Sequence, residues 1–212
     1  MLLNIDKKYA DLEAVNTRFN DDLQRHIDGT LPKNHIYRLG NPGEILLSAG
    51  IRDLPIELSA DRLTYKASVN YHHPFSIACL KNLPKAINNP IAVFDNVTGD
   101  VSKIILTTLK DDNGSNFVAA IRIRKDAGSR KVEVELNDIK TVYPKDRVLG
   151  IVEWINSKRN SLIWVDKEKA LNFISTQLSN PTGGGNSVQG INPKIINSAK
   201  NKINDFQNPS YP

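Results

Sequence analysis

The stretch KIILTTLKDDNGSNFVAAIRIRK, residues 103–125, predicts two antiparallel strands joined by a tight turn. Its first part, residues 103–109, is rich in Ile, Leu and Thr, and Asn113-Gly114 tolerates the positive φ of a hairpin turn. Residues 117–124 then alternate between apolar and basic positions, as a strand with one wet face does. The apolar face holds Phe117, Ala119, Ile121 and Ile123, and the other face holds Arg122 and Arg124.

Further strands are predicted on either side of this hairpin. Residues 91–94, IAVF, are short and apolar, and residues 132–136 alternate Val and Leu with Glu133 and Glu135. Residues 139–143 predict a further edge strand. Because the strands alternate between apolar and polar faces, we expect an α+β fold, with an antiparallel sheet of about four strands and helices before and after it.

Helices are predicted ahead of the sheet. Apolar residues at steps of three and four predict one long first helix that ends at Gly29. Short helices are expected with Asn41 as one N-cap, with Ser59 as another, and over residues 83–88. The stripe of the first helix consists of Tyr9, Leu12, Val15, Phe19, Leu23 and Ile27.

Helices are also predicted after the sheet. Val148, Val152 and Ile155 share one helical face, residues 162–165 read as a strand, and Asp166 can cap the next helix. The last helix is expected over residues 193–206, with one apolar side. That side holds Ile195, Ile196, Ala199 and Ile203.

Composition shifts divide the chain into four expected parts. Residues 1–35 form an N-terminal helical segment and residues 36–179 an α+β domain. Residues 180–192, rich in Gly, Asn and Ser, form a flexible linker, and residues 193–212 carry a C-terminal helix.

The composition is that of an ordinary globular protein. Of 212 residues, 40% are hydrophobic and 24% charged, and no apolar run approaches the length that spans a bilayer. No secretory signal is apparent, so we expect a cytoplasmic protein with no membrane partner. Cys79 is the only cysteine, which excludes an intrachain disulfide. The net charge of +5 mildly favours an anionic partner such as RNA.

Five ordered blocks carry a family resemblance over residues 39–169: LGNPGEILLSAGI (39–51), PIELSADRL (55–63), HPF (73–75), NLPKAINNPIAVF (82–94) and IKTVYPKD (139–146). They resemble the barnase–EndoU–colicin–RelE-like nuclease domains of phages and conjugative elements. They are also similar to the C-terminal toxin domain of phage MuF-like proteins. The resemblance implies an α+β nuclease-like fold and RNA cleavage without a metal or a cofactor.

The chain departs from that family pattern at three places. His72 stands where the family often has Asn, and Ser76 stands where an acidic residue is common. Thr141 replaces a usual Ser and keeps a hydroxyl. The missing carboxylate at Ser76 removes a group that would orient the site.

His73 is the leading candidate for proton transfer. Metal-free RNA cleavage needs a base for the 2′-OH, an acid for the leaving 5′-oxygen, and donors for the phosphate oxygens. Histidine suits proton transfer because its pKa lies near neutrality. Pro74 holds His73 in an extended or turn conformation, and His72 is a weaker candidate. The alternative is a histidine that only hydrogen-bonds within a turn.

Arg122 and Arg124 are candidates for phosphate binding, because paired guanidinium donors can clamp phosphate oxygens. Cross-strand salt bridges to Glu133 and Glu135 are the favoured alternative, since these glutamates have the same spacing on the expected partner strand.

The TVYPK block adds Thr141 and Tyr143 as candidate catalytic hydroxyls and Lys145 as a candidate phosphate ligand. Thr141 and Tyr143 would share one face of a strand. The alternative is that both are ordinary strand residues ended by Pro144. Cys79 is expected to be a small buried group rather than a nucleophile.

Three functions remain open on the sequence. The chain is expected to be a nuclease-like RNase domain, an RNA-binding module with the same fold, or a structural protein of a mobile element. In the last case a protein partner would bind through the apolar stripes of the terminal helices.

Overall fold

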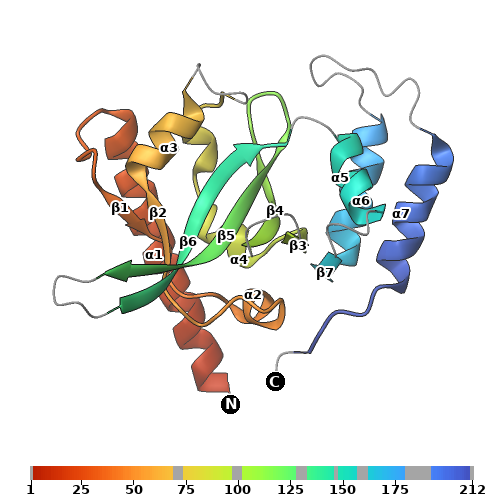
Figure 1. Cartoon of the computed structure of the whole chain (residues 1–212), viewed down its shortest axis with the longest axis horizontal. Helices are drawn as coiled ribbons and strands as arrows, with labels where there is room; N and C mark the ends of the chain where they lie inside the picture. The colour runs from red at the N-terminus through yellow and green to blue at the C-terminus, as the bar shows by residue number, and fades with distance from the viewer. Residues whose placement is uncertain are drawn as a thin grey trace.

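The computed structural model describes residues 2–68, 74–96, 102–127, 133–145, 148–156, 162–179 and 192–210. Within these ranges the chain forms one mixed sheet with helices on both faces (Figure 1). The seven strands are β1 (Ile36–Arg38), β2 (Ile56–Ser59), β3 (Ala92–Asn96), β4 (Ser102–Lys110), β5 (Asn116–Ala127), β6 (Glu133–Pro144) and β7 (Leu162–Val165). Their order across the sheet is β1-β2-β6-β5-β4-β3-β7.

The prediction of an α+β fold is confirmed, but the expected count of about four antiparallel strands is wrong. The consecutive strands β3, β4, β5 and β6 do pair antiparallel. To these the described sheet adds β1, β2 and β7, and β2 runs parallel to β6. The additional strands have three or four residues each, too few for a periodic pattern, so their neighbours in space determine their pairing.

Residues 132–136 and 139–143 were expected as separate strands, yet residues 133–144 form the single strand β6. A bulge opposite Ala120 and Ile121 interrupts the pairing of β6 with β5. Ala120 faces Thr141 and Ile121 faces Ile139, so Lys140 is the extra residue. A bulge of one residue breaks the alternation and makes one strand look like two.

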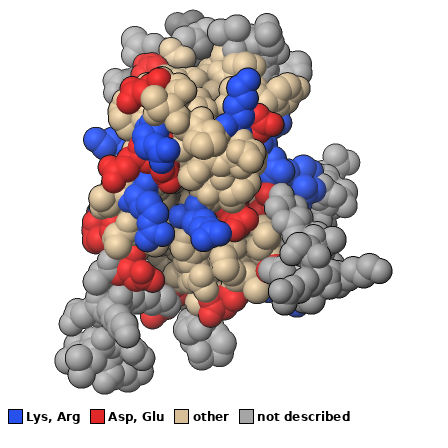
Figure 2. Space-filling view, turned by 90° about the vertical axis from the view of Figure 1, so that its left-hand side faces the viewer, with Lys and Arg blue, Asp and Glu red and all other residues tan. Residues whose placement is uncertain are grey.

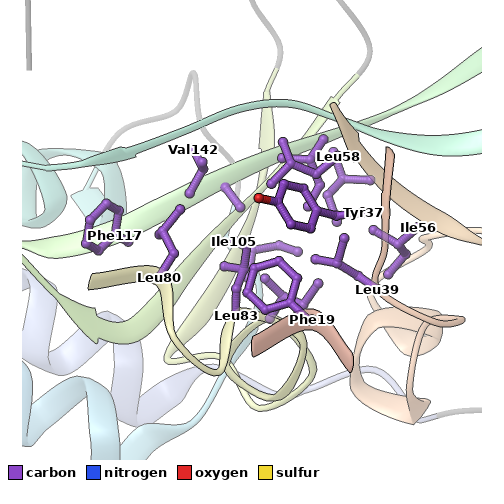
Figure 3. Packing of buried hydrophobic residues seen from close by; sticks show 14 of the residues in the cluster. Phe19, Tyr37, Leu39, Ile56, Leu58, Leu80, Leu83, Ile105, Phe117 and Val142 are labelled. Carbon is purple, nitrogen blue, oxygen red and sulfur yellow. The ribbon is translucent and has the colours of Figure 1, made fainter. Parts of the chain in front are cut away.

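One face of the sheet is covered by the helices that precede β3. These are α1 (Leu2–Ile27), α2 (Glu44–Ser48), α3 (Ala60–Ala67), the short 3-10 helix η1 (Ile77–Leu80) and α4 (Leu83–Asn88). Their apolar side chains meet the sheet in a first core, where Phe19 and Leu23 of α1 pack with Tyr37, Ile105 and Phe117 (Figure 3). Phe19 and Leu23 of the predicted stripe are therefore buried inside this chain, whereas Ile27 is 46% exposed.

The helices that follow β6 build a second core on the opposite face. They are α5 (Val148–Asn156), α6 (Lys167–Ser179) and α7 (Pro193–Asp205), gathered beside the β3–β7 end of the sheet (Figure 1). Phe94, Leu106 and Val118 of the sheet pack there with Ile151 of α5 and Ile203 of α7. Ile196, Ala199 and Ile203 of the predicted apolar side are thus buried within the chain, whereas Ile195 is exposed.

Two of the three N-cap residues predicted from the sequence are confirmed. The Ser59 hydroxyl accepts a bond from the Arg62 amide, and Asp166 accepts one from the Lys169 amide. The prediction for Asn41 is wrong, because Gly43 is the N-cap of α2 and Asn41 instead donates to Asp53.

No helix in the described ranges has both the length and the apolar composition needed to cross a membrane. The expected linker lies almost wholly outside the described residues, which resume at Asn192. The four expected parts stay a prediction, although α1 packs into the first core and α7 packs on α5 and α6 in the second core.

Candidate functional site

Strands β5 and β6 place three of the candidate residues on one face of the sheet. In the antiparallel register, Tyr143 lies opposite Val118 and Thr141 lies opposite Ala120, while Arg122 lies opposite Asp138. Directly opposed residues point to the same side of a sheet. Val118 belongs to the second core, so Arg122, Thr141 and Tyr143 all lie on the second face.

The register does not place Arg122 and Arg124 opposite Glu133 and Glu135, as the salt-bridge alternative expected. The register places Arg124 opposite Leu136, and Lys125, not an arginine, opposite Glu135. Glu135 instead pairs with Arg52, from the loop ahead of β2. The hairpin register, which pairs Ala127 with Glu133, places the glutamates away from the arginines, and this register was not visible in the spacing.

Arg122 instead joins a cluster of three charged residues, Arg62, Asp138 and Arg122, which we call the arginine–aspartate cluster. Arg62 Nη1 of α3 donates to Asp138 Oδ1 at 2.7 Å, and Arg122 Nε donates to Oδ2 at 3.4 Å. The carboxylate is 2% exposed, whereas Arg62 and Arg122 are 26% and 34% exposed. One buried anion therefore holds two cations whose side chains reach the surface.

Arg62 is also tied to the backbone. Its Nη1 donates to the Ile139 carbonyl oxygen at 2.8 Å, next to the aspartate. The Ser59 cap starts α3 directly after β2, and this places Arg62 within one turn of the sheet edge. A buried carboxylate needs such partners, because an unpaired charge in the interior is costly.

The cluster lies in a row of polar positions that crosses six strands. Successive pairings place Arg38 beside Glu57, Glu57 beside Asp138, and Arg122 beside Ser102. Ser102 lies beside Asn96, whose amide donates to the serine hydroxyl at 3.1 Å. The full row reads Arg38, Glu57, Asp138, Arg122, Ser102 and Asn96. Figure 1 shows α1 behind β2 and β6 in that view and α5, α6 and α7 away from them.

Thr141 has an unusual environment for a hydroxyl. Its Oγ1 is shielded from solvent and has no hydrogen-bond partner among the described residues. A buried hydroxyl without a partner costs about 1–3 kcal/mol. Such a group in a native structure calls for an explanation, and a role in the site would be one.

Tyr143 and Lys145 are tied to the second core. Tyr143 is partly buried against that core, and Lys145 Nζ lies over the Trp154 ring at 4.3 Å from its centroid. Trp154 also meets Phe94 edge to face at 5.9 Å. The structure therefore brings Arg122, Thr141 and Tyr143 to one face, while the Lys145 ammonium is directed to Trp154.

His72 and His73 lie outside the described residues, so the role of His73 stays a prediction. The rest of the HPF block is described. Phe75 packs against the first core and meets Phe117 edge to face at 5.0 Å. This aromatic contact fixes the chain two residues after His73 beside the start of β5.

Cys79 is a partly buried free thiol beside Asp112, with Sγ 3.5 Å from Oδ1. Burial, followed by the nearby Asp112 carboxylate, raises the pKa of this thiol. A raised pKa disfavours the thiolate, which is the nucleophilic form of cysteine. In the described part of the chain, no group of three His, Cys, Asp or Glu side chains is placed to hold a metal ion.

On the face of the molecule shown in Figure 2, positive and negative side chains are mixed. Among the coloured residues of Figure 2, which views the left-hand side of Figure 1, basic and acidic side chains interleave without one broad basic area. Recognition of an anion would therefore depend on local donors more than on a long-range field.

Two residues of the cluster were missed by the sequence analysis. Asp138 carried a signal, because it follows Val132, Val134 and Leu136 at a position where their alternation predicts an apolar residue. Arg62 carried none, since an arginine in the first turn of a short helix is ordinary. Only the packing of α3 beside the middle of β6 reveals its partner.

A protein-family model described as the phage MuF C-terminal domain matches residues 65–172, just over half of the chain. The match begins within α3 and ends within α6, so it contains Asp138 and Arg122 but not Arg62. No curated protein and no solved structure matches the chain.

Proposed function

The chain belongs to the phage MuF C-terminal domain family, and from this premise we propose that it acts on RNA as a metal-independent nuclease-like domain of a phage or conjugative element. The supporting observation is that Arg122, Thr141 and Tyr143, selected for this chemistry from the sequence, share one face of two paired strands. Phosphoryl chemistry needs donors and hydroxyls grouped in this way.

In the proposed reaction, His73 takes the proton from a ribose 2′-OH, whose oxygen attacks the adjacent phosphorus. The bond to the 5′-oxygen breaks, and that oxygen receives a proton from an acid, leaving a 2′,3′-cyclic phosphate and a 5′-hydroxyl. Arg122 stabilises the crowded phosphate charge, assisted by Arg124 and Lys145 in the same proposal. Thr141 and Tyr143 position the phosphate.

The test is RNA cleavage by the full chain in EDTA, comparing the parent with His73→Gln and a matched His72→Gln variant. We expect cleavage to fall about 100-fold or more in His73→Gln, the usual contribution of a general base, and to change little in His72→Gln. Equal activity of the parent and the His73 variant would overturn the role of His73. Absence of cleavage in the parent would overturn the enzymatic function.

Thr141→Val adds a second readout at the same site. The variant removes a buried hydroxyl without a partner and keeps the shape, so we expect the free energy of unfolding to rise by about 1 kcal/mol. If the hydroxyl serves the reaction, cleavage falls while stability rises. Chemical denaturation and the cleavage assay measure the two effects separately, and unchanged cleavage would remove Thr141 from the site.

A non-catalytic RNA-binding module is the second candidate. It is favoured by two contacts: Arg122 donates to Asp138, and the Lys145 ammonium lies over the Trp154 ring. Both cations therefore have structural roles, while their positive charge can still attract RNA. Binding that weakens steeply with salt, together with no cleavage in the assay above, would establish this function instead.

A further inference from the structure

We infer that Arg62 is a positioning residue of the candidate site, which fixes the bulge in β6 and so places Thr141 on the face that holds Arg122. The inference rests on the proposed function, because Thr141 and Arg122 have their roles in that reaction. Arg62 precedes residues 65–172, which the family model matches, so the site needs a side chain from the part of the chain ahead of that match.

The bulge decides which side chains of β6 share a face. Asp138 and Thr141 are three positions apart, and such side chains point to opposite faces of a regular strand. Here Asp138 lies opposite Arg122 on β5. Thr141 lies opposite Ala120, two positions before Arg122, so both β6 side chains belong to one face. The extra residue, Lys140, makes this possible, since a bulge re-aims the side chains that follow it.

Arg62 holds β6 at the point where the bulge begins. The pairing of β2 with β6 ends at Glu57 and Asp138, after which the chain of β2 turns into α3. The next carbonyl of β6, that of Ile139, accepts a hydrogen bond from Arg62 Nη1 at 2.8 Å. Ile139 comes directly before the extra residue Lys140. The arginine side chain therefore continues the contact with β6 where the neighbouring strand stops.

One nitrogen atom of Arg62 contacts two consecutive residues of β6. Nη1 donates to Asp138 Oδ1 at 2.7 Å as well as to the Ile139 carbonyl. The aspartate side chain is 2% exposed, and a hydrogen bond from a charged donor is strong in such surroundings. The two bonds together stabilise the direction of the backbone on the near side of the bulge.

Thr141 depends on that direction because it lies directly after the extra residue. Its buried hydroxyl has no hydrogen-bond partner among the described residues, so the backbone around the bulge determines where it points. A displacement of a reacting group by about 1 Å can lower a rate about 100-fold. Loss of the Arg62 contact is therefore expected to act on the reaction through Thr141.

The experiment measures kcat and KM for RNA cleavage in EDTA by the full chain. It compares the parent with Arg62→Met, which keeps an apolar stem and removes the donors. Arg52→Met is the matched control, because Arg52 also pairs with a carboxylate of β6, that of Glu135, away from the bulge. We expect kcat of Arg62→Met to fall about tenfold or more and KM to stay within about twofold, since a positioning residue does not bind the substrate. Arg52→Met is expected to keep both values near those of the parent.

A double variant tests the route through Thr141. If Arg62 acts by placing Thr141, the two losses in kcat overlap, and Arg62→Met with Thr141→Val is little slower than Thr141→Val alone. A merely structural arginine would lower kcat by the same factor with or without the threonine hydroxyl.

Amide hydrogen exchange gives a readout that does not require cleavage. Loss of bonds from a charged donor is expected to speed exchange over residues 138–142 about tenfold, while β4 exchanges as in the parent. Unchanged exchange over β4 also shows that the variant is folded. If Arg62→Met does not fold, the same substitution is made in Asp138→Asn, which removes the buried charge together with its partner. Each effect is then measured against Asp138→Asn alone.

The inference is overturned if Arg62→Met keeps the parent kcat, raises KM instead, or lowers kcat by the same factor in Thr141→Val. Unchanged exchange over residues 138–142 also overturns it. Cleavage by the parent together with any of these results keeps the proposed function and rejects the role of Arg62. Absence of cleavage by the parent rejects the proposed function, and hydrogen exchange then decides whether Arg62 fixes the bulge.

Discussion

His26 links three elements through single hydrogen bonds. Its Nδ1 lies 2.6 Å from the Tyr37 hydroxyl on β1, and its Nε2 lies 2.8 Å from Thr64 Oγ1 on α3. Thr64 donates its own proton to the Ala60 carbonyl, so its oxygen must accept from His26 Nε2. This network assigns the Nε2–H tautomer, in which Nδ1 accepts the tyrosine proton.

Protonation of His26 conflicts with this arrangement. A second N–H at Nδ1 would face the Tyr37 hydroxyl and displace the proton that Tyr37 now donates. Burial, with a smaller effect of nearby His35, lowers the pKa of His26 below its ordinary value. Burial also raises the pKa of Tyr37, which keeps its proton available as the donor.

We therefore expect stability to fall as the pH drops below about 6.5, the ordinary pKa of histidine. In that window the unfolded chain binds a proton at His26 that the folded chain does not, so the free energy of unfolding decreases with decreasing pH. One proton limits the effect to about tenfold in the unfolding constant per pH unit. Urea denaturation from pH 7.5 to 5.0 measures it.

His26→Gln is the control for this prediction. Glutamine cannot titrate, so its unfolding curves should lose less stability across the same pH range. If the parent and the variant show parallel pH profiles, the lowered pKa of His26 does not contribute to acid sensitivity.

At the scale of elements, α1 and α4 are joined through Asn82, the residue that precedes α4. Asn16 and Asn20 of α1 both donate to Asn82 Oδ1, at 2.8 and 2.9 Å, and the Asn82 amide donates back to Asn20 Oδ1. Asn82 has a φ of 69°, the left-handed region that most side chains avoid. The prediction of a helix over residues 83–88 is confirmed, but the way it attaches to α1 was not visible in the sequence.

Two substitutions separate the side-chain and backbone contributions of Asn82. Asn82→Gly removes the acceptor and leaves the buried Asn16 amide without it, at a cost of about 1–3 kcal/mol. Asn82→Ala loses the same bonds and adds about 1 kcal/mol, because alanine tolerates the left-handed conformation poorly. Thermal and urea unfolding measure both, and an alanine variant as stable as the glycine variant would contradict the backbone argument.

At the scale of the whole molecule, the C-terminal part completes the second core and one sheet edge. Helix α7 buries Ile196, Ala199 and Ile203 against that core. After the helix, the Asn208 side chain accepts from the Val165 amide at 2.8 Å and donates to the Val165 carbonyl at 2.7 Å. Both backbone groups of Val165 on edge strand β7 are thus satisfied by an amide side chain, which limits pairing with another chain.

Ile203→Ala and Ile195→Ala test whether α7 is part of this fold. Ile203 is fully buried, so its truncation should cost about 2–5 kcal/mol of stability. Ile195 lies on the same helix and is 38% exposed, so its truncation should change stability by only about 0.5 kcal/mol. Equal effects in urea denaturation would mean that α7 does not dock as described.

The apolar stripes of both terminal helices are used within the chain. The sequence allowed these stripes to bind a protein partner, because an amphipathic helix must cover its apolar face with something. In the fold, α1 covers the first face of the sheet and α7 contributes to the second core. Sequence periodicity identified the buried residues Phe19, Leu23, Ile196, Ala199 and Ile203, but Ile27 and Ile195, assigned to the same faces, are exposed.

The local elements of this protein follow from its sequence. Alternation and turn residues predicted β4 and β5, periodicity predicted α1, and capping residues predicted the starts of α3 and α6. These features depend on residues within a few positions of one another along the chain, so a local sequence pattern is enough to predict them. The phage MuF C-terminal relationship was likewise visible in short ordered blocks and is confirmed by the family match.

The tertiary structure alone decided the contacts of the candidate site. Arg122 was expected opposite glutamates and instead lies opposite Asp138, because the β5–β6 hairpin pairs Ala127 with Glu133 and this fixes the register at Arg122. Arg62, 76 positions before Asp138, reaches the same carboxylate only because α3 packs beside the middle of β6. Contacts between residues so far apart leave no periodic trace in one sequence, since they depend on how completed elements pack.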